Sequence, residues 1–463
     1  MGVLLRKALV ASVVTALTFG LAPVATAEED IVARLKHVPG LTVVSEGTAP
    51  AGYRFFILSY SQAADHRRPA AGRFEQRFQL LHKATDRPMV LHTSGYNMRT
   101  TAFRSEPTQL IDGNQISVEQ RFFEPSRPNP ADWDDLNIWQ AATDHHRIVE
   151  ALKPIYSKKW ISTGASKGGM TSVYHRRFYP RDVDGVVAYV APNDVINNYD
   201  RAYDKFFETV GDDATCRQAL NDVQHEALER RPELLAKYEA WAAANGRTFN
   251  QVLGSADKAF EMTVLDTVWA FWQYSKQADC AKVPATTASS DAIYEWIDGI
   301  AGWSFYTDQD VLAYAPYYYQ AATQLGAPAL KFRHLRDVTH YPPSFYEANS
   351  NLPPSLRSRH DPLPMLDVDF WVRTQSSQML FVYGANDPWG AEPFVPSKRD
   401  SYTYTAPGAN HGANISQLVP ADREAATKAL QRWANVPAPA NAAKTLSVSD
   451  FDRLEDARDR FPR

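Results

Sequence analysis

Cysteine, clustered basic residues and long apolar runs are all scarce in this sequence. The 463 residues include only two cysteines, which excludes a disulfide-dense scaffold. Lys and Arg number 49 against 53 Asp and Glu, and no block of like charge occurs. Without a basic stripe to displace counterions, we expect no nucleic-acid partner. Beyond the N-terminus, no uninterrupted apolar stretch comes near the length of about 20 residues that a membrane-spanning helix needs.

The N-terminus has the pattern of an export signal. Arg6 and Lys7 are positively charged, residues 8–21 are apolar, and Ala25-Thr26-Ala27 offers a small-residue cleavage site. The apolar run is too short for a spanning helix. We therefore expect residues 1–27 to be a signal peptide and the mature protein to be secreted, extracellular and not bound to a membrane. A retained N-terminal anchor is the alternative.

The two cysteines, Cys216 and Cys280, are expected to form one disulfide, because an exported chain meets an oxidising environment. Two buried free thiols are the alternative. Neither cysteine lies near sequence rich in His or Cys, and the adjacent His145 and His146 would point in different directions on a helix. We expect no metal and no cofactor.

Strand and helix patterns alternate through the first half of the chain. Strand-forming composition recurs in six segments: 53–60, 73–80, 89–92, 115–119, 159–162 and 186–190. Apolar residues repeat at helical spacing over 134–156, and a second helix is expected to end near Tyr179. This alternation predicts the α/β class with a doubly wound sheet.

The character of the sequence changes after Pro192. Residues 195–375 are dominated by helical patterns, and strand patterns return at 379–383 and 401–404. A helical block between two parts of one sheet predicts an inserted cap, and the return of strand patterns argues against a second domain in tandem. We expect a core formed by 28–194 and 376–436, a cap formed by 195–375, and a linker and tail over 437–463.

The strongest local signal is Gly164-Ala165-Ser166-Lys167-Gly168, a Gly-x-Ser-x-Gly pattern between a predicted strand and a predicted helix. In an α/β-hydrolase this context places a nucleophilic serine on a strained turn, with the N–H groups of the helix start beside it. A glycine-rich turn without chemistry is the alternative. A phosphate-binding loop is excluded, because Lys167 precedes the glycine pair.

A serine nucleophile needs a base that is oriented by an acid, and in this fold the chain order is serine, acid, histidine. Asp387 follows the predicted strand 379–383, and His411 follows the predicted strand near 401–404. Ligands meet such sheets at the carboxyl ends of the strands. The sequence therefore predicts an α/β-hydrolase with a Ser166–His411–Asp387 triad and an inserted helical cap.

Three other residues compete for these roles. Asp194 follows the strand 186–190 and could serve as the acid, although the capping preference of Asp favours a helix cap for the insert. His340 and His360 lie in proline-rich loops of the insert, where neither is well placed as the base.

The oxyanion of acyl transfer also needs donors. The backbone N–H of Lys167 is one candidate because it follows the nucleophile. The second is expected in the loop after strand 89–92, from Gly95 or Tyr96, and a plain turn glycine is the alternative.

These motifs resemble a known family. Gly164–Met170, Ile138–Val149 and the Asn410-His411-Gly412 turn resemble the secreted tripeptidyl aminopeptidases of filamentous actinobacteria, serine peptidases of the α/β-hydrolase type. A fainter similarity to the prolyl carboxypeptidase and dipeptidyl peptidase family lies in Val118–Phe123. There Gln120 and Phe123 replace a histidine and a tyrosine, so roles of those two groups do not carry over.

The resemblance implies an exopeptidase that releases short peptides, tripeptides above all, from a free N-terminus, with proline a candidate at the cleaved position. Such a substrate needs an anionic partner for its amine, for which Glu119 and Glu124 are candidates; ordinary surface carboxylates are the alternative.

Aromatic residues of the insert could stack on a proline ring or simply pack the cap: Trp303, Tyr306, Tyr317 and Tyr318. The residues themselves indicate only a capped serine hydrolase. An esterase or lipase with the same triad, and a non-catalytic binding protein on this scaffold, are the alternatives.

Overall fold

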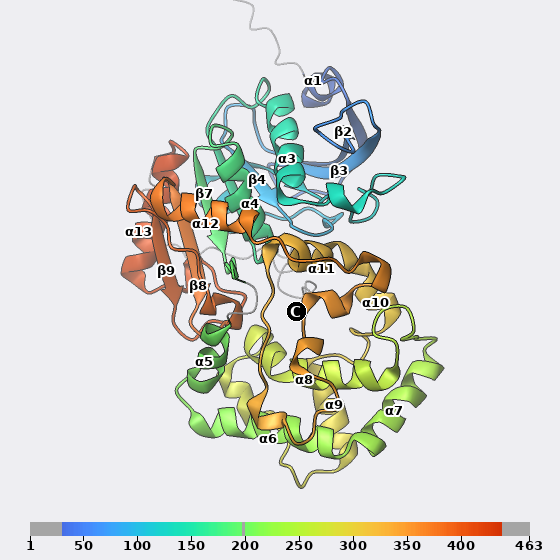
Figure 1. Cartoon of the computed structure of the whole chain (residues 1–463). Helices are drawn as coiled ribbons and strands as arrows, with labels where there is room; N and C mark the ends of the chain where they lie inside the picture. Colours follow the sequence, from blue (N-terminus) through green and yellow to red (C-terminus); the bar gives the residue numbers. More distant parts are fainter. Residues whose placement is uncertain (1–29, 197–199, 438–463) are drawn as a thin grey trace, which may run out of the picture.

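The computed structural model describes residues 30–196 and 200–437 (Figure 1). The expected signal peptide lies outside the described residues, as does nearly all of the expected C-terminal linker and tail.

One nine-stranded sheet organises the molecule, in the order β1-β2-β3-β5-β4-β6-β7-β8-β9. Strands β1 to β3 and β5 pair antiparallel, and every pair from β5 to β9 is parallel. The strands are β1 Leu41–Gly47, β2 Arg54–Ala63, β3 Arg73–His82, β4 Met89–Thr93, β5 Asn114–Val118, β6 Trp160–Ala165, β7 Gly185–Tyr189, β8 Met379–Gly384 and β9 Tyr402–Ala406.

Helices cover both faces of the sheet, because its central strands are apolar on both sides. In β8, Met379 and Phe381 pack into one core, while Leu380 and Val382 pack into the other. The first core includes residues of α1, α3, α4 and α12, and the second includes residues of α2 and α13. These helices are α1 Ile31–Lys36, α2 Glu106–Ile111, α3 Ile138–Leu152, α4 Lys167–Phe178, α12 Leu363–Thr374 and α13 Pro420–Trp433.

A buried ion pair fixes α3 to the strands beside it. The Arg121 guanidinium donates to both carboxylate oxygens of Asp144 on α3, at 2.7 and 2.9 Å. It also donates to the backbone carbonyls of Ala63, Ala64 and Asp135. Both side chains are fully buried, and the His66 ring also bonds to Asp144 Oδ1, at 2.6 Å.

A second group of helices lies in the chain between β7 and β8, which are neighbours in the sheet. Figure 1 shows most of these helices gathered below the sheet. All but the first of them share an apolar core of their own, which extends to Tyr96, Phe122 and Phe123 in loops of the sheet domain; the first helix packs Tyr203 against Trp269 and Trp389. The helices are α5 Arg201–Thr209, α6 Ala214–Glu229, α7 Arg231–Ala244, α8 Ala256–Tyr274, α9 Ser290–Ile300, α10 Asp308–Ala313 and α11 Ala315–Gln320.

The expected cap, 195–375, includes α12, but this helix packs elsewhere. Met365 and Val368 of α12 belong to the core between the sheet and α3 and α4. Arg177 of α4 pairs with Asp367 at 2.9 Å. The cap layer therefore ends before Leu363, a boundary that helical periodicity alone does not mark.

Cys216 on α6 and Cys280 in a short 3-10 helix, Gln277–Lys282, form the expected disulfide, with their Cα atoms 5.5 Å apart. The prediction is confirmed, and the bond ties two cap segments around a small apolar cluster that includes Leu220 and Trp272. Throughout residues 30–196 and 200–437, no helix combines the length and apolarity needed to cross a bilayer.

Removing the disulfide should destabilise the cap. The bond closes a chain separation of 64 residues, so chain entropy predicts a loss of about 4 kcal/mol in the unfolding free energy of the Cys216→Ala/Cys280→Ala variant. Urea denaturation measures this change. A double variant within about 1 kcal/mol of the parent would contradict the prediction.

Replacing Arg121 with Met should cost about 3 kcal/mol of stability, because it removes the guanidinium from a fully buried carboxylate and leaves the His66 ring, 2.6 Å from Asp144 Oδ1, as the side-chain partner of Asp144. Arg73→Met is the matched control, since Arg73 is exposed on β3, and should change stability by only about 0.5 kcal/mol. Thermal denaturation compares the two. Equal melting temperatures for the two variants would show that the pair carries no such role.

Candidate active site

The end of β4 and the start of α4 approach each other closer than side chains would permit. A Cβ atom on Gly168 would lie 2.3 Å from the Thr93 carbonyl oxygen, and one on Gly164 would lie 2.4 Å from the Gly168 carbonyl oxygen. The Thr93 hydroxyl forms hydrogen bonds with Gly168 O and with Ser172 Oγ, both at 2.7 Å, and these bonds hold the two segments together. Glycine is therefore required on both sides of Ser166.

Ser166 occupies the turn between β6 and α4 with φ 55° and ψ −129°. A positive φ is unfavourable for a residue with a side chain, and such strain persists only where surrounding contacts impose it. Here the Ser166 N–H donates to Tyr189 O at 2.9 Å, and the close glycine contacts hold the turn on its other side. The serine is the first residue beyond the sheet edge.

Asp387 and His411 come together beyond the ends of β8 and β9. His411 Nδ1 lies 2.8 Å from Asp387 Oδ2, and both side chains are buried. A carboxylate can only accept here, so the neutral ring carries its proton on Nδ1 and presents Nε2 as a base. Among the described residues, Nε2 has no hydrogen-bond partner.

Contacts through the cap connect this pair with Ser166. The Tyr96 hydroxyl is hydrogen-bonded to the Ser166 side chain, and Tyr274 at the end of α8 lies close enough to act on the pKa of Tyr96. Gln273 donates to the Tyr274 hydroxyl at 2.8 Å, and its carbonyl accepts the His411 N–H at 3.1 Å. Because β6, β8 and β9 are parallel, the three candidate residues lie at one edge of the sheet.

The loop with the second oxyanion candidates lies directly against the helix start. A Cβ atom on Gly95, which has φ +74°, would lie 2.5 Å from Gly168 N. The Tyr96 N–H is directed at Ser94 Oγ at 3.3 Å, so Gly95 is the better candidate for a donor.

Lys167 has a second feature that sequence reasoning missed. Its side chain is buried, and its ammonium group donates to Gly95 O. The Nζ atom lies 5.4 and 5.7 Å from the ring centres of Tyr96 and Phe123. Burial lowers the pKa of Lys167 well below its usual value. The side chain fastens the Gly95 loop, while its backbone N–H begins the helix.

Glu119 and Glu124 have partners of their own. The buried Glu119 carboxylate accepts from Arg77 at 2.6 Å and from the Ser126 hydroxyl at 2.7 Å. Glu124 is 67% exposed and pairs with Arg127. The structure therefore commits Glu119 to partners inside the protein and leaves Glu124 at the surface in a single ion pair, a difference that depends on loop packing rather than on residue type.

The competing residues do not take part in the Asp387–His411 pair. The helix-cap interpretation of Asp194 is wrong, because α5 begins at Arg201 and its N-cap residue is Asp200. His340 lies near Asp257, and the His360 ring bonds to Ala322 O at 3.1 Å. No group of three potential metal ligands gathers anywhere in the described parts of the chain.

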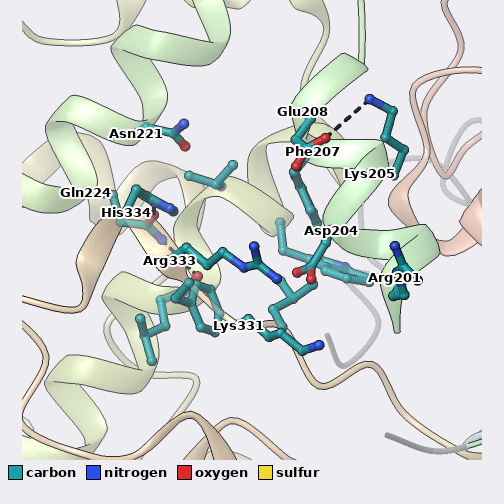
Figure 2. Close-up of a pocket in the computed structure, with 15 residues that line it drawn as sticks. Arg201, Asp204, Lys205, Phe207, Glu208, Asn221, Gln224, Lys331, Arg333 and His334 are labelled. Atoms are coloured by element: carbon teal, nitrogen blue, oxygen red, sulfur yellow. Dashed lines mark hydrogen bonds and ion pairs between the residues drawn. The ribbon is translucent and has the colours of Figure 1, made fainter. Parts of the chain in front are cut away.

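Two neighbouring hollows among the described residues are lined mainly by the cap. Figure 2 shows the larger one, where Arg201, Lys205 and Arg333 surround a space that includes neither Ser166 nor His411. The smaller one is aromatic and lies nearer to the catalytic candidates, with Trp389 as a wall. Trp269 contributes to both hollows and separates them. The smaller hollow is lined by residues that include Trp269, Tyr306, Tyr317, Tyr318, Pro328, Tyr346, Glu347 and Trp389.

The family model described as PS-10 peptidase S37 matches residues 24–461. The chain belongs to the S37 peptidase family. It is 54% identical over 446 residues to the prolyl tri/tetrapeptidyl aminopeptidase of Streptomyces mobaraensis, covering 94% of this chain and 93% of that protein. The resemblance to actinobacterial aminopeptidases is thus confirmed, and this S37 member is a serine peptidase.

Solved structures with a similar arrangement are distant in sequence. Esterase E22 is 11% identical, with a TM-score of 0.40, and the match covers 85% of this chain and 98% of the esterase. Peroxisomal α/β-hydrolase Lpx1 of Saccharomyces cerevisiae is 10% identical, with a TM-score of 0.37, and covers 86% and 94%. The chain's own architecture, a nine-stranded, mostly parallel sheet with helices on both faces, confirms the predicted α/β class.

We expect Ser166→Ala to abolish covalent labelling by a fluorophosphonate, because the reagent needs this hydroxyl activated by His411. Intact-protein mass spectrometry measures the adduct. Ser162→Ala is the control, since that buried hydroxyl lies within β6 and bonds to Ser172, and should retain labelling. Undiminished labelling of Ser166→Ala would rule out this nucleophile.

Proposed function

We propose that this S37 peptidase is a secreted exopeptidase that releases short peptides, tripeptides above all, from the free N-terminus of its substrates through an acyl-enzyme. The observation that carries the proposal is the buried Asp387–His411 pair, whose Nε2 has no partner among the described residues, at the same sheet edge as the strained Ser166. The name of the Streptomyces relative supports the exopeptidase activity.

In the proposed mechanism, Ser166 Oγ attacks the scissile carbonyl while His411 Nε2 takes its proton. Asp387 holds the ring orientation and stabilises the imidazolium. The N–H groups of Lys167 and Gly95 bind the oxyanion of the tetrahedral intermediate. His411 then gives the proton to the leaving amine, and a water molecule, activated by the same ring, hydrolyses the acyl-enzyme.

The cap supports exopeptidase action for a steric reason. Helix α8 bonds to the His411 backbone, so cap side chains lie directly over the catalytic edge. A roof at this position admits the end of an extended peptide and excludes folded polypeptide. Access limited to a chain end is what an exopeptidase requires.

Proline at the cleaved position is supported by the aromatic hollow and by the relative's name. Tyr306, Tyr317 and Tyr318 line that hollow with aromatic faces of the kind that pack on a proline ring, and its volume of about 30 Å³ means that its walls must move apart to admit one. Trp303 has another role, since it packs between Phe260 and Tyr294, at 5.5 and 4.7 Å, within the cap core. Secretion is supported by the pattern of residues 1–27 and by a disulfide suited to an oxidising compartment.

The test compares Ala-Ala-Pro p-nitroanilide, Ala-Ala-Ala p-nitroanilide and p-nitrophenyl butyrate. We expect both anilides to be cleaved, with kcat/KM higher for the proline substrate by roughly tenfold or more, the range of one well-filled apolar contact. Hydrolysis of the ester without hydrolysis of either anilide would favour the esterase alternative. No turnover of any substrate, together with no acylated Ser166, would favour a binding protein.

A further inference from the structure

Asp194 is a buried carboxylate that the catalytic mechanism does not use. It lies just beyond the end of β7, where its residue surface is 2% exposed. Neither of its side-chain oxygens has a hydrogen-bond partner among the described residues. A buried carboxylate without partners is costly, so each such group needs an explanation, and a role in binding a cationic group is one.

Two further acidic side chains lie close to it. The N–H of the preceding residue, Asn193, donates to Glu392 O at 2.9 Å, and this backbone bond brings Asp194 beside Glu392. Asp200 is also buried; its Oδ2 accepts the Ala329 N–H at 2.9 Å, while its Oδ1 has no partner among the described residues. Asp200 and Glu392 therefore both lie near Asp194 at the boundary of sheet and cap, without the three acids converging on a common point as metal ligands would.

The protonation of the three acids reflects this crowding. Burial, together with the charges of Asp200 and Glu392, raises the pKa of Asp194 well above its usual value. Burial likewise raises the pKa of Asp200 to about 6 and that of Glu392 to about 7. The charge of Lys331 lowers the pKa of Asp200. No cation among the described residues has such an effect on the pKa of Asp194. A cation bound among these groups would relieve the excess of acid and favour the charged carboxylates.

Asp194 adjoins the aromatic hollow. A Cβ atom on Gly326 would lie 2.1 Å from Asp194 O, and the next two residues, Ala327 and Pro328, line the hollow. Tyr317 lines it as well; burial raises the pKa of this phenol, and the charge of Asp194 raises it further, which places the carboxylate near the ring.

The same hollow also borders the catalytic candidates. The Tyr317 ring lies 5.6 Å from the ring of Tyr96, whose hydroxyl bonds to Ser166. The Trp389 ring lies 6.2 Å from the His411 ring. Asp194 is therefore one aromatic layer away from the residues that contact the nucleophile and the base.

We propose that Asp194, with Asp200 and Glu392 beside it, binds the N-terminal ammonium group of the substrate, an inference that rests on the exopeptidase function proposed above. An ammonium group has three N–H donors. The two oxygens of Asp194 and Oδ1 of Asp200 are acceptors without partners among the described residues. Aromatic faces nearby add a cation–π attraction.

An anchor at this place also limits the length of the released peptide. An extended chain spans about 3.3–3.6 Å per residue, so the amine of a tripeptide lies roughly 10 Å from its scissile carbonyl. A fixed ammonium site separated from Ser166 by the rings of Tyr317 and Tyr96 therefore selects peptides of a few residues. Blocking the amine removes the charge on which this selection depends.

The test uses Asp194→Asn, which keeps the shape of the side chain and removes its charge. For Ala-Ala-Pro p-nitroanilide and its N-acetylated form, the parent enzyme should prefer the free amine. In the variant, the ratio of the two kcat/KM values should fall by roughly 30-fold or more, the range for one partner of a buried charge pair. Asp291→Asn is the matched control, because that carboxylate is 72% exposed on the cap surface, and should leave the ratio unchanged.

Folding is checked by thermal denaturation and by the rate of fluorophosphonate labelling at Ser166. Because Asp194→Asn removes a buried unpaired acid, the melting temperature of the enzyme without substrate should not fall. If that variant does not fold, Asp200→Asn, which retains an acceptor for the Ala329 N–H, replaces it and should lower the ratio in the same direction.

The outcomes separate this inference from the proposed function. An unchanged ratio in a folded variant overturns the ammonium site, as does equal cleavage of free and acetylated peptides by the parent enzyme, and both leave the serine peptidase in place. Failure of the parent enzyme to cleave any peptide substrate overturns the exopeptidase function itself.

Discussion

The close backbone contact between the end of β4 and the start of α4 is the constraint on which the site depends. Gly164 and Gly168 allow the two segments to meet, and Thr93 fastens them. This contact imposes the positive φ of Ser166 and brings Gly95 against the helix start. Lys167 adds a buried bond to the same loop. The candidate nucleophile and the candidate oxyanion donors are therefore parts of one closely packed unit.

The sequence was most informative where local pattern and topology coincide. Ser166, Asp387 and His411 could be proposed because each follows a segment with strand composition, and parallel strands end at one edge. Strand β1 was missed, because most of Leu41–Gly47 is exposed and has little apolar alternation. Long-range packing was also hidden. Neither the attachment of α12 to the sheet nor the burial of Asp194 follows from neighbouring residues.

The motifs that identified the family have structural as well as chemical roles. Asp144, within the motif 138–149, pairs with Arg121 of the motif 118–123, and this buried pair holds α3 in place. Gln120, where the more distant family has histidine, bonds to the Tyr174 hydroxyl at 3.2 Å and to Gln320 of the cap at 3.3 Å. These residues mark the scaffold that carries the site, while the contacts proposed for the substrate amine come from Asp194 and its neighbours.

The cap and the histidine loop are joined at one corner. The Gln273 carbonyl accepts the His411 N–H at 3.1 Å, and Asn410 donates to Ser275 O at 3.1 Å. A movement of α8 away from the sheet would break both bonds and pull on the loop that carries His411. The position of the cap and the geometry of the Asp387–His411 pair are therefore coupled at this corner.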